Sequence, residues 1–257
     1  MVQNKIPVAF VSGATGTVGR AVVDRLLREN FAVTMFSRSS GKLVEAEREL
    51  LEKYPMTILR ICVGDVINEK DVMGAIKWTH NHSGDIDLLV TCHAAQPMIK
   101  PTVNLSIAEF MSVIESDLVG TFNVNRLIGS NMIKTGGGCI VNLSSIHSIA
   151  TYPQRAAYAA AKAGVVGFSR ALAIEWGSRN VRVNCISPWQ VKGPRTTNAN
   201  GHQISDVIKR SPSGKLIEAA EIANTVLYFW NTPGCTGPNM VLDGGVLSSA
   251  WYMPYGE

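Results

Sequence analysis

Tyr158 and Lys162 have the residue types and the spacing that proton transfer requires. They lie four residues apart in the segment AAYAAAK (156–162), and positions i and i+4 share one face of a helix. A phenol has a pKa of about 10, and a neighbouring ammonium group favours the phenolate. Lowering that pKa to about 7 requires roughly 4 kcal/mol, at about 1.4 kcal/mol per unit. The pair therefore suits general acid/base chemistry on an alcohol or carbonyl; the alternative is a surface helix with two ordinary polar residues.

A glycine-rich turn near the N-terminus offers a place for a cofactor phosphate. SGATGTVGR (12–20) follows the apolar run 6–12 and opens 18–29, a segment with helical periodicity. Glycines let the backbone approach a pyrophosphate there, and the helix N-terminus attracts its charge. A plain strand–helix connection is the alternative. The residues that we expect to bind a dinucleotide at this turn are Gly13, Thr15, Gly16, Thr17, Val18 and Gly19.

The end of the second predicted strand, 31–37, bears on the choice of dinucleotide. NAD binders usually place an acidic residue there to hold the ribose hydroxyls, whereas this chain has Ser37 and Arg38. A guanidinium group can pair with a 2′-phosphate, so the sequence favours NADP over NAD. An exposed arginine at a strand end is the alternative. Asp65, after the third strand, is expected either to contact the adenine amine or to cap a turn.

The elements that must position these residues alternate along the chain. Apolar runs predict strands, and segments of helical periodicity lie between them. Strands that are apolar throughout indicate a parallel sheet covered on both faces. We therefore expect one doubly wound α/β domain over 1–257, with ligands at the carboxyl ends of the strands. The predicted strands are 6–12, 31–37, 57–64, 86–92, 138–145, 181–187 and 239–245; the predicted helices are 18–29, 42–54, 69–81, 106–134 with a bend near Gly120, 155–178 and 218–230.

Composition excludes several classes of function. Of the 257 residues, 46% are hydrophobic and 17% charged, which is ordinary for a globular domain. No apolar run is long enough to span a membrane, and the N-terminus lacks a cleavage site, so we expect a cytoplasmic protein. Five cysteines without paired spacing argue against disulfides and against a metal site. A net charge of +4 is too small to indicate nucleic acid, but basic residues cluster between Lys192 and Lys215, which suits an anionic substrate.

Taken together, the motifs resemble the classical short-chain dehydrogenase/reductase family, in particular its 3-oxoacyl-carrier-protein reductase-like members. The resemblance spans nearly the whole chain and implies a Rossmann-like fold. It also implies hydride transfer between NADP(H) and a secondary alcohol or ketone, with Tyr158 as general acid/base and Lys162 holding the nicotinamide ribose. It assigns Ser145 as the donor to the substrate oxygen, with Ser144 as the fallback. The motifs that carry it are the glycine turn at 13, GDV at 64–66, IVNLSS at 140–145, Tyr158 with Lys162, RVNCISP at 182–188, EIA at 221–223 and LDGG at 242–245.

The chain departs from the family pattern at four places. Thr17 stands where the family has glycine, and Gly16 compensates. TCHAA (91–95) replaces the usual NNAG, and we interpret His93 as structural rather than as a base. Asp117 occupies the position of a catalytic asparagine that holds a water beside the lysine. Trp189 follows Pro188 in place of glycine, where it either narrows the site or covers the core. The further cofactor contacts that the resemblance implies are Val66, Cys92, His93, Ala94, Pro188 and Val191.

The substrate remains open at this point. The polar segment 190–214 is expected to form a substrate loop, and Gln96, His147, Gln154 and Trp189 are candidates to line the site. Such groups suit a polar hydroxy or keto compound. A sugar or polyol dehydrogenase that uses NAD is one alternative, and a non-catalytic regulator that senses a dinucleotide is another. The family resemblance also implies a homotetramer.

Overall fold

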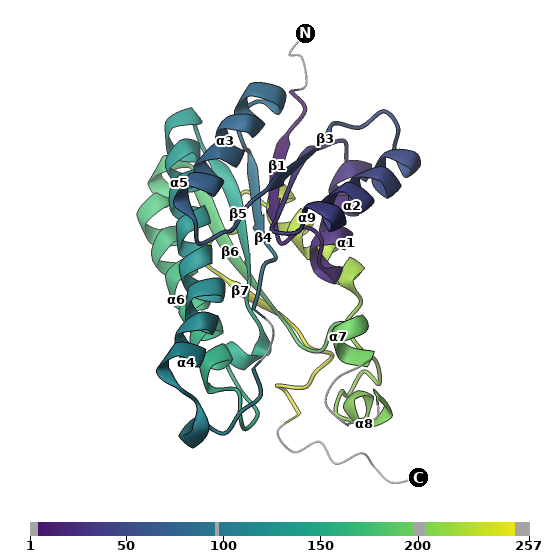
Figure 1. The fold of residues 1–257 in the computed structure, drawn as a ribbon, viewed down its shortest axis with the longest axis vertical. Coiled ribbons are helices and arrows are strands. Elements are labelled where there is room, and N and C mark those ends of the chain that lie inside the picture. The colour runs from purple at the N-terminus through teal and green to yellow at the C-terminus, as the bar shows by residue number, and fades with distance from the viewer. Residues whose placement is uncertain (1–4, 96–97, 198–203, 250–257) are drawn as a thin grey trace.

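Seven parallel strands form one sheet in the order β3-β2-β1-β4-β5-β6-β7 (Figure 1). The structure is a computed structural model that describes residues 5–95, 98–197 and 204–249. The doubly wound sheet predicted from the sequence is confirmed, and each strand agrees with its predicted range to within a few residues. The strands are β1 (Val8–Ser12), β2 (Ala32–Ser37), β3 (Leu59–Val63), β4 (Leu88–Thr91), β5 (Gly138–Leu143), β6 (Val181–Pro188) and β7 (Asn239–Leu242).

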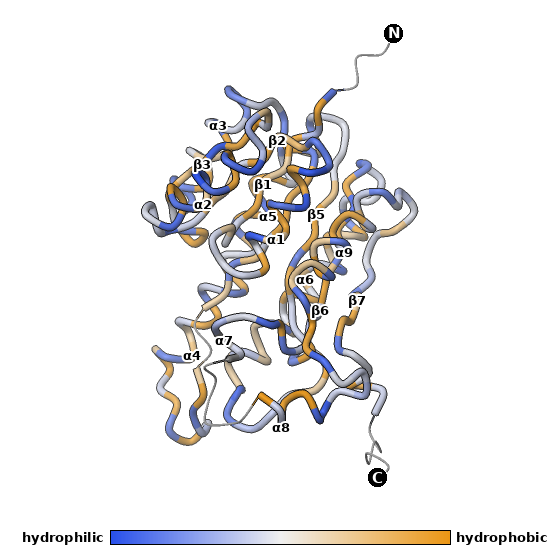
Figure 2. Tube along the Cα trace, turned by 90° about the vertical axis from the view of Figure 1, so that its right-hand side faces the viewer, coloured by the Kyte–Doolittle hydropathy of each residue, from blue (hydrophilic) through white to orange (hydrophobic). Residues whose placement is uncertain are grey.

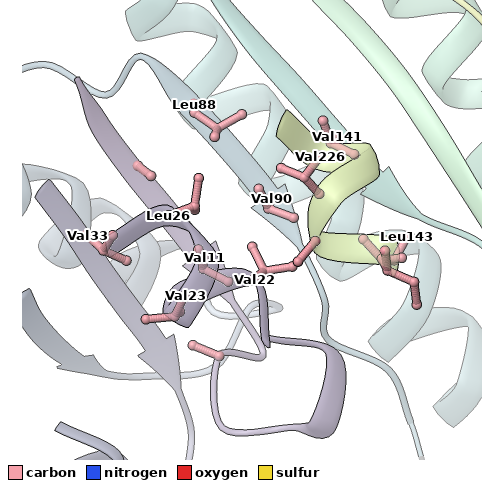
Figure 3. Packing of buried hydrophobic residues seen from close by; sticks show 14 of the residues in the cluster. Val11, Val22, Val23, Leu26, Val33, Leu88, Val90, Val141, Leu143 and Val226 are labelled. Carbon is pink, nitrogen blue, oxygen red and sulfur yellow. The ribbon is translucent and has the colours of Figure 1, made fainter. Parts of the chain in front are cut away.

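Helices cover both faces of the sheet because successive strand residues point to opposite sides. On β1, Ala9 and Val11 face α1 (Thr17–Arg28), α2 (Ser40–Lys53) and α9 (Ala219–Asn231). Val8 and Phe10 face α3 (Glu69–Ser83), α5 (Gly120–Thr135) and α6 (Ala156–Trp176). Figure 3 shows the first of these layers, where Val11 lies near Val22, and Val226 lies near Val90 and Val141. Hydrophobic residues gather in the central strands (Figure 2).

The strand order places β1 beside β4, so the chain changes direction across the sheet between them. The loops that follow these two strands open at the carboxyl edge, where open α/β sheets bind ligands. Three short helices gather at this end of the molecule (Figure 1): α4 (Ile107–Ile114), α7 (Pro194–Thr197) and α8 (Ile204–Ile208). The predicted loop 190–214 thus contains two of them, with 198–203 outside the described residues.

The helical region predicted over 106–134 is interrupted close to its expected bend. α4 begins with a capping box of Ser106 and Glu109, and a π-helical turn, Glu115–Val119, separates it from α5. A π turn adds a residue to the helix and is frequently found at functional sites. Here it carries Asp117 into the interior. None of the helices described is long and apolar enough to cross a membrane.

Candidate active site

Helix α6 brings Tyr158 and Lys162 together, as the spacing predicts. Lys162 is 2% exposed, and its Nζ lies 5.6 Å from the centre of the Tyr158 ring. The ammonium group donates a hydrogen bond to the Leu143 carbonyl at the end of β5, at 3.2 Å. Tyr158 is partly exposed, so a buried cation stands beside a phenol that solvent can reach.

The two serines after β5 have different surroundings. Ser144 Oγ donates to the Lys162 carbonyl at 2.8 Å, so its hydroxyl proton holds helix α6 in place. Ser145 is 7% exposed and begins a short 3-10 turn, where its Oγ accepts from the His147 N–H at 3.3 Å. Its hydroxyl proton remains available for an incoming oxygen. The His147 ring, on the same turn, lies 5.5 Å from the Tyr158 ring, which places this turn beside Tyr158.

Asp117 contacts the ammonium group of Lys162 directly. Its Oδ2 lies 3.3 Å from Lys162 Nζ, and neither side chain is more than 3% exposed. Oδ1 accepts from the Ala95 N–H at 2.5 Å, while Oδ2 has no well-aligned hydrogen bond. Burial is the largest single influence on Lys162 and opposes its charged form, but the contributions of Asp117, Tyr158 and Cys185 together outweigh it, so the pKa of Lys162 is raised. The ammonium is therefore a permanent charge at neutral pH.

His93 joins the loop after β4 to the π turn that holds Asp117. Its Nδ1 lies 2.7 Å from Ser12 Oγ, and its Nε2 lies 3.2 Å from Thr121 Oγ1. Because Thr121 donates its only hydroxyl proton to the Asp117 carbonyl, it must accept from Nε2–H. Nδ1 then accepts from Ser12. Burial, with the nearby Lys162 charge, lowers the pKa of His93 to about 4, which agrees with the structural role expected for it.

The glycine turn has the shape that a dinucleotide phosphate needs. Gly13 has φ of +66°, and a Cβ there would lie 2.4 Å from the His93 backbone nitrogen. At Gly19, a Cβ would lie 2.4 Å from the Gly13 carbonyl oxygen. Gly16 faces open space instead: its Cβ would approach nothing closer than the same oxygen, at 3.5 Å. Gly13 and Gly19 let the turn close, and Gly16 leaves room for a phosphate at the helix N-terminus.

The residues expected around the adenosine end lie beside this turn. Thr15 Oγ1 and Ser37 Oγ are 3.0 Å apart, which ties the turn to the end of β2. The side chain of Arg38 is 71% exposed, and its NH1 is 3.7 Å from Asp65 Oδ2, so it is free to reorient. Asp65 also accepts from the Ile67 N–H at 3.2 Å, as a turn cap does. Val66 is held through its carbonyl by Asn123 Nδ2 at 2.8 Å.

The remaining predicted cofactor residues line the ends of β4 and β6. Burial raises the pKa of the Cys92 thiol to about 12, which removes it as a nucleophile, and Ala94 follows His93 in the same loop. Pro188 ends β6 in register with Leu242, and Val191 pairs with Ile217. A Cβ at Gly193 would come 3.0 Å from the Thr17 side chain, so the chain after β6 returns to the glycine turn, where Val18 begins to pack on the core.

The three substrate candidates that the structure describes do not come together as a set. Gln96 lies outside the described residues. Trp189 is 6% exposed, packs in the core beside α9 and donates from Nε1 to Tyr152 Oη at 3.2 Å, which favours the alternative that it covers the core. Gln154 is exposed with φ of +67°. Only His147 contacts Tyr158, and burial, with the charge of Arg155, lowers its pKa to about 4.

Sequence reasoning missed Ser12, Thr121 and Tyr152. Thr121 follows Asp117 by four residues, so helical spacing alone pointed to a contact. Ser12 and Tyr152 carried no such signal, because their partners are distant in the sequence. Among the residues described, no three His, Cys, Asp or Glu side chains form a group that could hold a metal.

Comparison with known proteins agrees with this geometry. A family model described as "Enoyl-(Acyl carrier protein) reductase" matches residues 13–247. The chain is 32% identical over 250 residues to peroxisomal 2,4-dienoyl-CoA reductase of Rattus norvegicus, covering 95% of this chain and 84% of the relative. It is 35% identical over 184 residues to D-threitol dehydrogenase of Mycolicibacterium smegmatis, covering 70% of each. The structure of levodione reductase superimposes with a TM-score of 0.90 at 27% identity, covering 95% of this chain and 98% of that one. The chain belongs to the classical short-chain dehydrogenase/reductase family of oxidoreductases.

Proposed function

We propose that this oxidoreductase transfers a hydride between NADP(H) and a secondary alcohol or ketone, with Tyr158 as general acid/base. The observation that carries the proposal is the buried Lys162 ammonium, 5.6 Å from the centre of the partly exposed Tyr158 ring. A cation at that position lowers the cost of removing the phenolic proton. General acid/base groups of this kind contribute about 10² to 10⁴ in rate.

The proposed roles follow from the hydrogen-bonding capacity of each side chain. Ser145 Oγ donates to the carbonyl oxygen of a ketone, and Tyr158 donates its phenolic proton to the same oxygen as the carbonyl carbon receives a hydride. Bound NADPH would supply that hydride. Lys162 stabilises the phenolate that remains until a solvent proton restores the phenol, and Asp117 keeps Lys162 charged. In alcohol oxidation each proton moves in the reverse direction.

Arg38 supports the preference for NADP, because its exposed guanidinium group is only weakly paired with Asp65 and can turn toward a 2′-phosphate. Gly13, Gly16, Gly19, Thr15 and Ser37 would hold the phosphates and adenosine ribose. The resemblance to D-threitol dehydrogenase favours the polyol alternative. The third alternative, a regulator without turnover, predicts binding of a dinucleotide but no reaction.

A single assay distinguishes the NADPH-dependent ketone reductase from the polyol dehydrogenase and from the regulator without turnover. The purified protein would be mixed with NADPH or NADH and a panel of ketones, and with the oxidised cofactors and a panel of secondary alcohols and polyols. Faster ketone reduction with NADPH is the expected result. Polyol oxidation with NAD⁺ would favour the second reading, and cofactor binding without turnover across both panels would favour the third.

We further propose one catalytic domain over 1–257, with 190–214 as its substrate loop, assembled as a cytoplasmic homotetramer. Support for the assembly comes from an exposed apolar face of α6 at helical spacing, which consists of Ala160, Ala163, Gly167, Ala171 and Ile174. Ile174, the largest side chain of this face, is 84% exposed. Light scattering after gel filtration would give the mass, and Ile174→Asp should dissociate the assembly. For the location, imaging of a tagged chain is required, because several relatives are named as peroxisomal.

A further inference from the structure

Arg155 lies near enough to Tyr158 for the two groups to interact electrostatically, and it forms no ion pair with a described residue. It precedes helix α6 and its carbonyl accepts from the Ala159 N–H at 2.8 Å, so it starts the helical hydrogen-bond ladder. Tyr158 follows three residues later, at the third position of the helix that Arg155 precedes. The residue is partly buried, and burial disfavours the charge of the guanidinium and lowers its pKa. Among the described residues, no carboxylate forms an ion pair with it.

A second arginine lies at the outer side of the same cluster. The Arg210 guanidinium carbon lies 5.8 Å from the centre of the Tyr152 ring. That ring is 5.3 Å from the His147 ring, which in turn is 5.5 Å from the Tyr158 ring. Arg210 also forms no ion pair with a described residue, so two arginines flank one run of aromatic rings that ends at Tyr158.

The sequence around the site contains almost nothing to neutralise these charges. Residues 143–174, which include Arg155, contain no Asp or Glu. Lys192 is paired, with Glu218 at 2.9 Å, and His147 is neutral at pH 7 because its pKa is about 4. The positive charges of Arg155 and Arg210 attract anions to the carboxyl end of the sheet.

We propose that Arg155 binds an oxoanion of the substrate, a carboxylate or a phosphate, a few bonds from the carbonyl that Tyr158 protonates, with Arg210 assisting from outside. A planar guanidinium group binds both oxoanions through two parallel hydrogen bonds. The bound anion supplies the charge that the partly buried side chain lacks. The substrate is then a keto acid or a keto phosphate and its alcohol counterpart. This inference rests on the proposed reaction at Tyr158.

The test uses two matched pairs of ketones. One is 4-oxopentanoate against its methyl ester, and the other is dihydroxyacetone phosphate against dihydroxyacetone. For each, kcat/KM would be measured with NADPH, and binding to the NADP⁺ complex by calorimetry. The proteins are the parent, Arg155→Gln, Arg155→Lys and, as a remote control, Arg48→Gln on exposed α2. The pair that shows the preference identifies the source of the oxoanion.

We expect the parent to prefer one charged ketone over its neutral partner by at least about tenfold, as charge-assisted hydrogen bonds of about 1.5–3 kcal/mol require. Arg155→Gln should bring that ratio to about one, Arg155→Lys should retain part of it, and Arg48→Gln should retain all of it. Equal binding of the charged and neutral members, or a preference that survives in Arg155→Gln, overturns the inference.

Failure of the reaction is distinguishable from failure of the site. If no ketone is reduced but the anion still binds in an Arg155-dependent manner, the proposed function fails and the binding site stands. If neither pair binds or reacts, the inference is wrong. A change of oligomeric mass in Arg155→Gln with an unchanged preference would instead place Arg155 at a subunit interface, and would also overturn it.

Discussion

Lys162 Nζ lies 3.3 Å from Asp117 Oδ2, with both side chains almost fully buried. The carboxylate keeps the lysine charged and also offsets part of the positive field at Tyr158. Asp117→Asn should therefore strengthen the positive field at Tyr158 and move the pH profile of alcohol oxidation to lower pH. The profile of kcat/KM against pH would measure the shift. Superimposable profiles would remove Asp117 from the proposed proton relay.

The ion pair between Lys162 and Asp117 predicts that the stability of the parent and that of Asp117→Asn change with pH in opposite directions. The pKa of Lys162 is raised above its usual 10.5 in the folded parent. The free energy of unfolding that the ion pair contributes is therefore fully present below pH 10.5 and is lost as pH rises through the folded pKa. In Asp117→Asn, a buried ammonium without a counter-charge has a lowered pKa, so stability should increase as pH approaches 10.5. Urea unfolding from pH 8 to 11 would compare the slopes, and parallel curves would contradict the prediction.

Tyr158→Phe should lower turnover at least about a hundredfold, because it removes the proton donor and leaves the ring. Tyr228 is an exposed residue of α9, so Tyr228→Phe is the matched control and should retain parental activity. Steady-state rates with the best substrate of the panel would measure both. Comparable rates in Tyr158→Phe and the parent would mean that the phenol has only a structural role.

Arg38→Leu should weaken the binding of NADPH by roughly ten- to a hundredfold and the binding of NADH much less, since a hydrogen bond to a charged group contributes about 1.5–3 kcal/mol. Folding should not change, because the side chain is 71% exposed. Fluorescence titration of both reduced cofactors would test this, with Arg48→Leu as control. Tighter binding of NADH than NADPH to the parent would overturn the NADP assignment.

Two glycines of the same turn should respond differently to a methyl group. Gly13→Ala places a Cβ at positive φ, 2.4 Å from a backbone nitrogen, and should cost at least about 2 kcal/mol of stability. In Gly16→Ala the new Cβ meets no protein atom closer than 3.5 Å. The free energy of unfolding should therefore change by less than about 0.5 kcal/mol, while the affinity for the cofactor falls. Undiminished affinity in Gly16→Ala would show that no phosphate lies over this residue.

His93 should make the protein sensitive to acid. Its pKa is lowered from 6.5 to about 4, mainly by burial, so the stability it contributes is complete above pH 6.5 and is lost as pH falls toward 4. The loss at pH 5 is about 2 kcal/mol, at about 1.4 kcal/mol per unit. His93→Asn should flatten the stability curve over this range relative to His82→Asn, at the exposed end of α3. An unchanged slope would contradict the assignment.

The strands and long helices were predictable because their signals are local. Apolar runs and 3.6-residue periodicity come from neighbours in the sequence, and the Tyr158–Lys162 pair depends only on helical spacing. The ion pair of Asp117 with Lys162 was not predictable in its direct form, because it depends on a π turn that rotates Asp117 inward. The contacts of His93 with Ser12 and Thr121 join residues 81 and 28 positions apart, and no periodicity encodes them.

Trp189 illustrates a different limit. Two interpretations of its indole were equally consistent with the sequence, since an aromatic residue after a strand can face a ligand or the core. The outcome depends on α9, which lies some thirty residues later and packs against the same cluster, and on Tyr152, whose hydroxyl accepts from the indole N–H. Burial of such a residue is decided by tertiary packing, which a single sequence does not display.

The backbone contact between Gly13 and His93 has a consequence for engineering. The glycine turn touches the loop after β4, and that loop continues through Thr121 to the carbonyl of Asp117 and so to the lysine. Residues 13–19 are therefore not an exchangeable module. A graft that imports the turn of another dehydrogenase to alter cofactor choice should also displace the histidine, and would have to transplant 92–95 with it to preserve the chemistry at Tyr158.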